Sequence, residues 1–308
     1  MSMQTAATPA PLPTRRSKPP LGRDWIAALL FLTPALIGFF IFFAFPVVRG
    51  FYISLTDWDL LTDAEYVGLE NYQDLLNNRD FRDSLVRTAY YVVLNIPLQT
   101  FFALGIALLF DRYVRGSRIR SLLLLPWLIP NVIVALLFLW LLDANLGIVN
   151  EALQAIGLNR IAFFGNPDWA MPTIAGINIW RHMGYTALLI LAGMSRIPKD
   201  IYEAGALDGA TETQMFRHLT LPLLRPVVTF VLVTSVVGSF QIYDTIAVTT
   251  QGGPVRATRV VYWFIYEHAF ERFNFGFASA AAFLLFMILI VISLLQMRIL
   301  RANESYLD

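Results

Sequence analysis

Hydrophobic and polar residues alternate in long blocks after residue 23. Five runs of at least 18 residues contain no Asp, Glu, Lys or Arg, and a sixth is interrupted only by Arg181 and His182. A helix that crosses the bilayer core of about 30 Å needs about 20 apolar residues, and its backbone satisfies its own hydrogen bonds in lipid. We therefore predict an all-α integral membrane protein with six transmembrane helices. The predicted spans are residues 25–48, 88–110, 121–142, 169–194, 226–246 and 276–297.

The first 23 residues differ from the rest of the chain. They contain five prolines, separated mainly by Ala, Thr and Arg, and few large apolar side chains. Because such a segment cannot bury enough apolar surface to fold, we expect residues 1–23 to be a disordered cytoplasmic tail. Residues 24–308 are expected to form one transmembrane domain. The first apolar run is too long for a signal peptide, and no A-x-A cleavage site follows it, so we expect a retained helix.

Composition supports the membrane prediction and excludes several kinds of site. The 308 residues are 57% hydrophobic and 15% charged, with a mean hydropathy of +0.59. Soluble domains are about 45–50% apolar and about 25% charged. The absence of cysteine excludes disulfides and thiolate metal sites, and the three histidines lie too far apart for a metal-binding motif. A net charge of +1 argues against a nucleic-acid partner, which needs a concentrated basic surface.

The distribution of Lys and Arg predicts the orientation of the spans. With a cytoplasmic N-terminus, the cytoplasmic segments hold 14 Lys and Arg residues and the external segments hold 8. The loop from Asp111 to Arg120 alone contains four arginines. Because cytoplasmic loops are enriched in positive charge, both termini are expected to face the cytoplasm.

Known catalytic motifs are missing from the sequence. The only lysines, Lys18 and Lys199, do not belong to a G-x-x-x-x-G-K-[ST] loop, and neither G-x-S-x-G nor H-E-x-x-H occurs. The spans also lack the buried acids of a proton relay. We expect a protein that is not an enzyme and that depends on a partner for energy if it moves a solute uphill.

The predicted cytoplasmic loop, residues 197–222, has the pattern of two short helices joined by a bend. Asp200 and Glu203 have the spacing of a capping box at the start of the first helix, and Thr211 and Gln214 repeat that spacing for the second. This pattern alone is also compatible with an ordinary connector.

Glycine and proline are expected to shape the same loop. Gly209 lies between the two short helices, where a positive φ is easiest for glycine, and Pro222 is expected to end the second helix. Ala204, Gly205 and Ala206 offer a small-residue surface that another protein can approach closely.

This loop resembles the EAA loop of binding-protein-dependent ABC importer permeases. The family pattern is E-A-A, three residues, Gly, nine residues and I-x-L-P. Here the matching residues are Glu203-Ala204-Gly205, Gly209 and Leu219-Thr220-Leu221-Pro222, with Gly205 and Leu219 departing from the pattern. In the family the loop fits a groove on the ATPase subunit. The resemblance therefore implies an ATPase-docking loop that contains Glu203, Ala204, Gly205, Asp208, Gly209, Leu219, Leu221 and Pro222.

Other segments resemble the sugar-type permeases of that family. These segments are Leu32-Thr33-Pro34-Ala35, Phe45-Pro46, Ser54-Leu55-Thr56-Asp57-Trp58, Val67-Gly68-Leu69-Glu70-Asn71-Tyr72 and Thr249-Thr250-Gln251-Gly252-Gly253-Pro254. One departure is Arg87-Thr88, where the branch often has Asn-Thr. The resemblance implies the type I importer permease fold and the carbohydrate-uptake branch, related to maltose and glycerol-phosphate permeases.

Polar residues inside the spans are candidates for a solute pathway, because they are costly in lipid. Thr234, Gly238, Gln241 and Thr245 lie on one face of the fifth span. The candidates for contact with the solute are Asn95, Gln99, Trp127, Asn131, Gln241, Tyr243 and Asp244. Helix–helix hydrogen bonding is the alternative for each of them. Pro126 and Pro130 are expected to open the backbone of the third span.

Arg181 allows two interpretations. Its long side chain is expected to reach the membrane interface, or it pairs with Asp244 and closes an outer gate. The neighbouring His182 is expected to be a packing residue.

The resemblance and the residue patterns together predict a permease subunit of an ATP-binding-cassette importer that moves a sugar by alternating access, and the resemblance implies the bacterial inner membrane. The implied partners are a second permease, two cytoplasmic ATPases and an external solute-binding protein. ATP and Mg are expected on the ATPases, and no cofactor or metal on this chain. Glycerol-3-phosphate or its diesters are an alternative solute. A secondary transporter that works alone and a membrane-embedded enzyme are less favoured alternatives.

Overall fold

The computed structural model describes residues 24–114 and 116–300, so the predicted tail of residues 1–23 lies outside the described part of the chain. The chain divides into two compact units, residues 1–49 and 50–308. In the first unit α1 (Asp24–Phe39) and the π-helical turn η1 (Phe40–Ala44) continue into α2 (Phe45–Ile53), which crosses the boundary between the units. No charged side chain interrupts residues 25–48, as expected for a helix surrounded by lipid.

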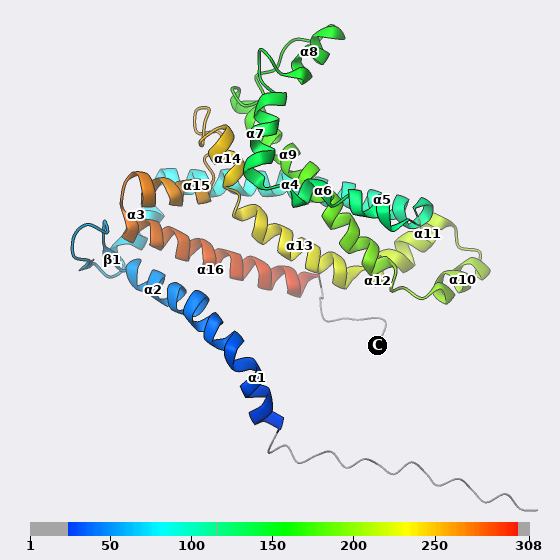
Figure 1. The fold of residues 1–308 in the computed structure, drawn as a ribbon, viewed down its shortest axis with the longest axis horizontal. Helices are drawn as coiled ribbons and strands as arrows, with labels where there is room; N and C mark the ends of the chain where they lie inside the picture. Colours follow the sequence, from blue (N-terminus) through cyan, green and yellow to red (C-terminus); the bar gives the residue numbers. More distant parts are fainter. Residues whose placement is uncertain (1–23, 115, 301–308) are drawn as a thin grey trace, which may run out of the picture. The chain divides into compact units, whose positions relative to one another are not determined.

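The second unit is almost entirely helical (Figure 1). A small antiparallel pair of strands, β1 (Thr56–Asp57) and β2 (Glu65–Tyr66), precedes its helices. The helical elements in chain order are α3 (Glu70–Asn77), α4 (Arg79–Tyr113), α5 (Ser117–Leu122), α6 (Leu125–Leu128), α7 (Asn131–Leu141), α8 (Ile148–Ala155), α9 (Pro167–Met194), α10 (Lys199–Leu207), α11 (Glu212–Met215), η2 (Phe216–Thr220), α12 (Leu221–Leu223), α13 (Arg225–Phe240), α14 (Asp244–Thr249), α15 (Val261–Tyr266), η3 (Glu267–Glu271) and α16 (Phe275–Ile299).

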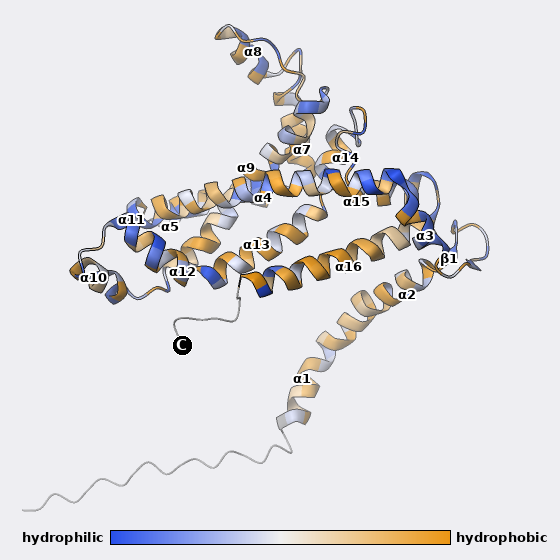
Figure 2. Ribbon diagram, turned by 180° about the vertical axis from the view of Figure 1, so that it is seen from behind, coloured by the Kyte–Doolittle hydropathy of each residue, from blue (hydrophilic) through white to orange (hydrophobic). Residues whose placement is uncertain are grey.

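Helices α4 and α9 form the most extensive helix pair of the second unit. Ala103 and Ala107 of α4 pack against Ala187 and Ile190 of α9 in one buried cluster. Small side chains let helix backbones approach closely, which is the main source of packing energy between helices in lipid. Helix α13 lies beside α16, and Figure 2 shows that α16 is hydrophobic along most of its length.

Four helical stretches within the described residues are long and apolar enough to cross a membrane. They are Trp25–Ile53, Arg79–Tyr113, Arg225–Thr249 and Phe275–Ile299, which correspond to the predicted first, second, fifth and sixth spans. Helix α9, with 28 residues, coincides with the predicted fourth span but carries more polar side chains. The predicted third span is divided among α5, α6 and α7. The count of six spans therefore stays a prediction.

Pro130 accounts for the break between α6 and α7 in the third span. Helix α6 ends at Leu128, and Ile129 (φ −74°, ψ 132°) and Pro130 (φ −55°, ψ 139°) are extended before α7 begins. A proline disfavours the α conformation in the residue before it, and it has no N–H to donate. The expected opening of the backbone is confirmed at Pro130, whereas Pro126 lies inside α6 and Leu124 before this helix keeps a helical conformation.

The predicted two-helix loop is present as α10 and α11, but two details of the prediction are wrong. Gly209 has a φ of +78°, and Thr211 and Gln214 form the predicted capping box. Asp200 does not cap α10, because Pro198 occupies the N-cap position and places Asp200 inside the first turn.

Pro222 also does not end the second short helix. The π-helical turn η2 precedes it, and the chain continues through α12 into α13 with one intervening residue, Leu224. The wider π-helical turn shifts the preceding carbonyls away from the positions that a proline ring would meet in a regular α-helix.

Candidate functional site

A cavity of about 440 Å³ lies among α4, α7, α9, α13 and α14. The predicted polar face of the fifth span reaches it: Thr234 and Gly238 from α13, Gln241 after the end of that helix, and Thr245 from α14. The helix is interrupted at residues 241–243, so this face combines two helical segments and the turn between them.

Helix α9 supplies a second polar face that the sequence reasoning missed. Asn178, His182, Tyr185 and Leu189 line the cavity at positions i, i+4, i+7 and i+11. This is the same spacing as that of the four residues from the fifth span, so the pattern was available in the sequence.

Asn95 and Gln99 link α4 to its neighbours. The Asn95 amide donates to the Ser239 hydroxyl at 3.1 Å and accepts from the Asn178 amide at 3.1 Å. The Gln99 amide donates to the Thr186 hydroxyl at 3.0 Å, and both of these side chains line the cavity. Asn95 is fully buried, so its placement fits helix–helix bonding, whereas Gln99 has both a helix partner and a place at the cavity.

The two broken spans meet at Asn131 and Asp244. Each is the first residue of its helix, α7 or α14, and both line the cavity. The Asn131 amide donates to the Asp244 carboxylate at 3.0 Å. These two predicted residues are therefore brought together at the points where their helices restart.

Aromatic rings flank the polar part of the cavity. Trp127 stacks on Tyr185, with ring centroids 4.6 Å apart and planes 9° apart, and Tyr185 lines the cavity. Tyr243 lies 5.9 Å from Tyr262 and 4.9 Å from Tyr266, measured between centroids. Flat rings beside hydroxyl and amide groups form a surface suited to a sugar ring, which has apolar and polar faces.

Arg181 directs its donors to the backbone, and no ion pair joins it to Asp244 within the described residues. Its guanidinium donates to the Ile129 carbonyl at 3.0 Å and to the Trp127 carbonyl at 3.0 Å, and it contacts the His182 ring at 3.0 Å. The carbonyls at a helix end lack partners within the helix. Arg181 therefore stabilises the break between α6 and α7, a role that neither of the two interpretations included.

The predicted ATPase-docking loop presents both polar and apolar groups. Glu203, Ala204 and Asp208 are exposed, and Leu207, which the prediction did not include, is 90% exposed. Gly205 faces Leu219, so its missing Cβ lets α10 approach η2 closely. The Tyr202 hydroxyl and the Thr220 hydroxyl lie 3.0 Å apart and also join α10 to η2.

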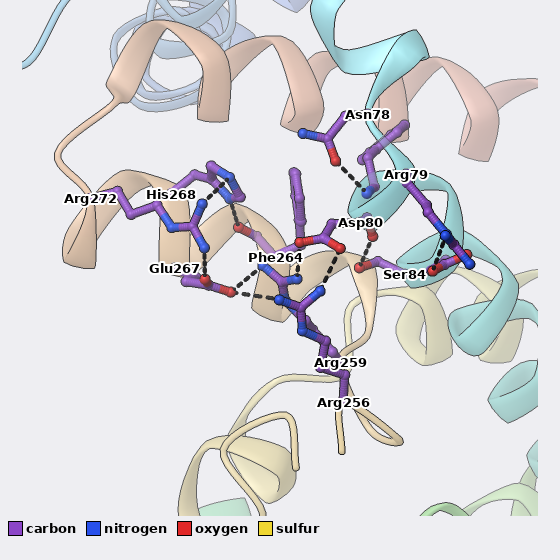
Figure 3. A network of polar contacts seen from close by, with 12 residues as sticks. Asn78, Arg79, Asp80, Ser84, Arg256, Arg259, Phe264, Glu267, His268 and Arg272 are labelled. Carbon is purple, nitrogen blue, oxygen red and sulfur yellow. Dashed lines mark hydrogen bonds and ion pairs between the residues drawn. The ribbon is translucent and has the colours of Figure 1, made fainter. Parts of the chain in front are cut away.

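Five charged residues form what we call the arginine network: Asp80, Arg256, Arg259, Glu267 and Arg272 (Figure 3). The Arg259 side chain, only 7% exposed, pairs with Asp80 at 2.7 Å and with Glu267 at 2.6 Å. Arg256 pairs with Asp80 at 2.6 Å, and Arg272 pairs with Glu267. Burial raises the pKa of Glu267, but hydrogen bonds and positive charge from Arg259 and Arg272 lower it more, so this pKa lies below its ordinary value.

The network ties the segment between α14 and α15 to the start of α4. Nearby, the Val261 backbone N–H donates to the Thr88 hydroxyl at 2.9 Å, and Arg87 donates to the Ala257 carbonyl at 3.4 Å. The Arg87-Thr88 pair, which departs from the branch pattern, thus contacts this segment directly.

Comparisons with known proteins agree with this arrangement. Residues 99–304 match the family described as binding-protein-dependent transport system inner membrane component. The probable ABC transporter permease protein YurN of Bacillus subtilis (strain 168) is 33% identical over 291 residues, which are 92% of this chain and 99% of that protein. The trehalose/maltose transport system permease protein MalF of Thermococcus litoralis is 30% identical over 278 residues, which are 90% of this chain and 94% of that protein.

A solved structure extends the likeness to three dimensions. The bacterial alginate ABC transporter in complex with an alginate pentasaccharide-bound periplasmic protein includes a chain with a TM-score of 0.77 and 26% identity, over 92% of this chain and 96% of that one. These relatives are transport proteins, which confirms the resemblance and the expectation of a transport subunit rather than an enzyme. The chain belongs to the family of inner membrane components of binding-protein-dependent transport systems.

Proposed function

We propose that this chain is the membrane-spanning permease of an ABC importer that carries a sugar or sugar-like solute by alternating access. The observation that carries the proposal is the cavity between the two broken spans, lined by amides, hydroxyls and tyrosine rings. The named relatives support the solute class, since one transports trehalose and maltose and a solved neighbour transports alginate. In this proposal the chain adopts the six-span type I fold, with both termini in the cytoplasm.

The energy would come from two ATPase subunits that bind ATP and Mg. The exposed surface of α10 and the bend at Gly209 would fit a groove on one ATPase, and ATPase closure would reach the spans through η2 and α12. A second permease and a solute-binding protein complete the assembly. The solved alginate neighbour, which includes a periplasmic protein, supports this type of partner.

The experiment compares the chain alone with the chain co-expressed with its ATPase and second permease. Proteoliposomes that contain the full assembly and its solute-binding protein are expected to take up solute only with internal ATP. Uptake by the chain alone without ATP would overturn the proposal and favour the secondary-transporter alternative.

A matched pair of glycine variants tests the docking loop. Gly209 (φ +78°) and Gly157 (φ +82°) both have open space within 4 Å of where a Cβ would be added, and a Val at either position strains the backbone because of its positive φ. Gly209→Val is expected to weaken co-purification of the ATPase and to lower ATP-driven uptake. Gly157→Val is expected to leave co-purification unchanged. Equal effects of the two variants would contradict the docking role.

A further inference from the structure

The side chains that line the cavity include many polar groups but almost no charged ones. Asp244 is the only charged side chain among the described lining residues, and no Lys or Arg is among them. The other polar groups are amides, hydroxyls and the His182 ring, such as those of Gln99, Asn131 and Thr186. This set offers many hydrogen-bond donors and acceptors but no cation to pair with an anionic solute.

Arg181 adds no side chain to the cavity lining, and its charge interacts electrostatically with that of Asp244 across this boundary. Its donors are directed to the carbonyls of Trp127 and Ile129 and to the His182 ring, and the side chain is not among the cavity lining. Moving the guanidinium toward a solute would leave the carbonyls at the break between α6 and α7 without partners.

Tyr91 of α4 gives a second, independent observation. Its side chain is 0% exposed and lines the cavity, and its hydroxyl has no hydrogen-bond partner within the part of the chain that the structure describes. A buried hydroxyl normally has a partner, because leaving it without one is unfavourable. The hydroxyl has no surface open to the cavity in this structure, so a polar solute supplies such a partner only when the side chains around Tyr91 move apart.

We propose that the cavity takes an uncharged sugar, that Tyr91 binds one of its hydroxyls, and that Asp244 sets the preference for uncharged over anionic sugars. This inference rests on the proposed importer function. The Asp244 carboxylate accepts hydrogen bonds from sugar hydroxyls, whereas it repels a phosphate or a sugar carboxylate in a site where water screens charges poorly. The acidic polysaccharide of the alginate transporter would then need a differently charged cavity.

The test uses matched solutes on the permease–ATPase assembly in lipid nanodiscs. Equilibrium dialysis measures the binding of labelled trehalose against trehalose 6-phosphate, and of methyl glucoside against methyl glucuronide. Each neutral probe is expected to bind at least about tenfold more tightly than its anionic counterpart, which corresponds to about 1.4 kcal/mol. Equal or tighter binding of the anionic probes, or failure of both neutral probes to bind, would overturn the inference.

Asp244→Asn sharpens the test, because the amide keeps the shape of the side chain and can still accept the hydrogen bond from Asn131. The preference for neutral probes is expected to fall by about tenfold in this variant. Asp168→Asn, which removes an exposed acid from the first turn of α9, is expected to leave the preference unchanged. An unchanged preference in Asp244→Asn would remove that residue from the proposal.

Tyr91→Phe tests the hydroxyl itself. The variant is expected to bind neutral probes several-fold more weakly while its melting temperature does not fall, a combination that a structural role would not produce. Retained affinity in this variant would contradict the role of the hydroxyl. ATPase co-purification is measured in parallel, so a failed binding test with an intact assembly overturns this inference and leaves the importer function standing.

Discussion

The arginine network and the central cavity satisfy their polar groups in opposite ways. In the network each charged side chain has an oppositely charged partner, and Asp80, Arg259 and Glu267 have two each. In the cavity Asp244 receives an amide rather than a cation, and the Tyr91 hydroxyl has no partner among the described residues.

This difference separates a scaffold from a site. Paired charges hold two segments in one arrangement, and breaking the pairs of the buried Arg259 leaves poorly hydrated charges. Polar groups with unused capacity are available to a solute and stabilise the empty protein less. Substitutions in the network should therefore lower stability, whereas substitutions in the cavity should change binding.

Arg259→Leu should have the largest effect on stability. The change leaves Asp80 and Glu267 without their shared buried partner, and the expected loss is about 3 kcal/mol, near the lower end for a broken buried pair because the Asp80 side chain is 31% exposed. Denaturation in detergent, followed by helical circular dichroism, measures it. Arg256→Leu is the control, since its side chain is 65% exposed, and it should lose less than about 1 kcal/mol. Equal losses would contradict the assignment of Arg259 as the centre.

Acid should weaken the same network through Glu267. The pKa of this carboxyl is lower in the folded protein than in the unfolded chain, so the ionised form favours folding. That contribution is fully present above the unfolded value of about 4.3 and is lost as the pH falls through the lower folded value. The difference in unfolding free energy between wild type and Glu267→Gln should shrink over this range. If this difference does not vary with pH, the ionised Glu267 carboxylate makes no pH-dependent contribution to the free energy of unfolding.

Asn95→Leu should have a smaller effect than Arg259→Leu. The variant loses the bonds to Ser239 and Asn178 that join α4 to α13 and α9, and interhelical hydrogen bonds in membranes contribute about 0.6 kcal/mol each on average. Thr100→Val on the same helix is the control, because the Thr100 hydroxyl has no partner among the described residues. A loss in the control as large as that in Asn95→Leu would mean that packing, not hydrogen bonding, determines both.

The sequence predicted the parts that depend on local pattern. Length and hydropathy located the apolar stretches, proline chemistry indicated the break near Pro130, and Gly209 and the Thr211–Gln214 box have the expected conformations. Asp200 was assigned wrongly because Pro198, two residues earlier, already occupies the cap position. Local rules compete, and the spacing of a capping box does not decide which residue starts a helix.

Contacts between distant segments were not accessible from the sequence. Arg181 bonds to Ile129 across 52 positions, and Arg259 bonds to Asp80 across 179. Which distant residues bond to each other depends on how the helices pack, and helix packing cannot be read directly from a single sequence. The cavity face of α9 is different, because its periodicity was present in the sequence and was overlooked.

Tyr91→Phe should have the smallest effect on stability. The sign of that change tests the difference between the arginine network and the cavity. Removing a buried hydroxyl that has no partner leaves the packing of the ring unchanged and removes an unfavourable burial, so stability should stay constant or rise by up to about 1 kcal/mol. Thr88→Val, three residues earlier on α4, removes a hydroxyl that accepts from the Val261 N–H and donates to the Ser84 carbonyl, and it should lose about 1–2 kcal/mol. If Tyr91→Phe lost as much as Thr88→Val under the same denaturation conditions, the Tyr91 hydroxyl would belong to the scaffold, and the distinction between paired and unpaired groups would not separate the two regions.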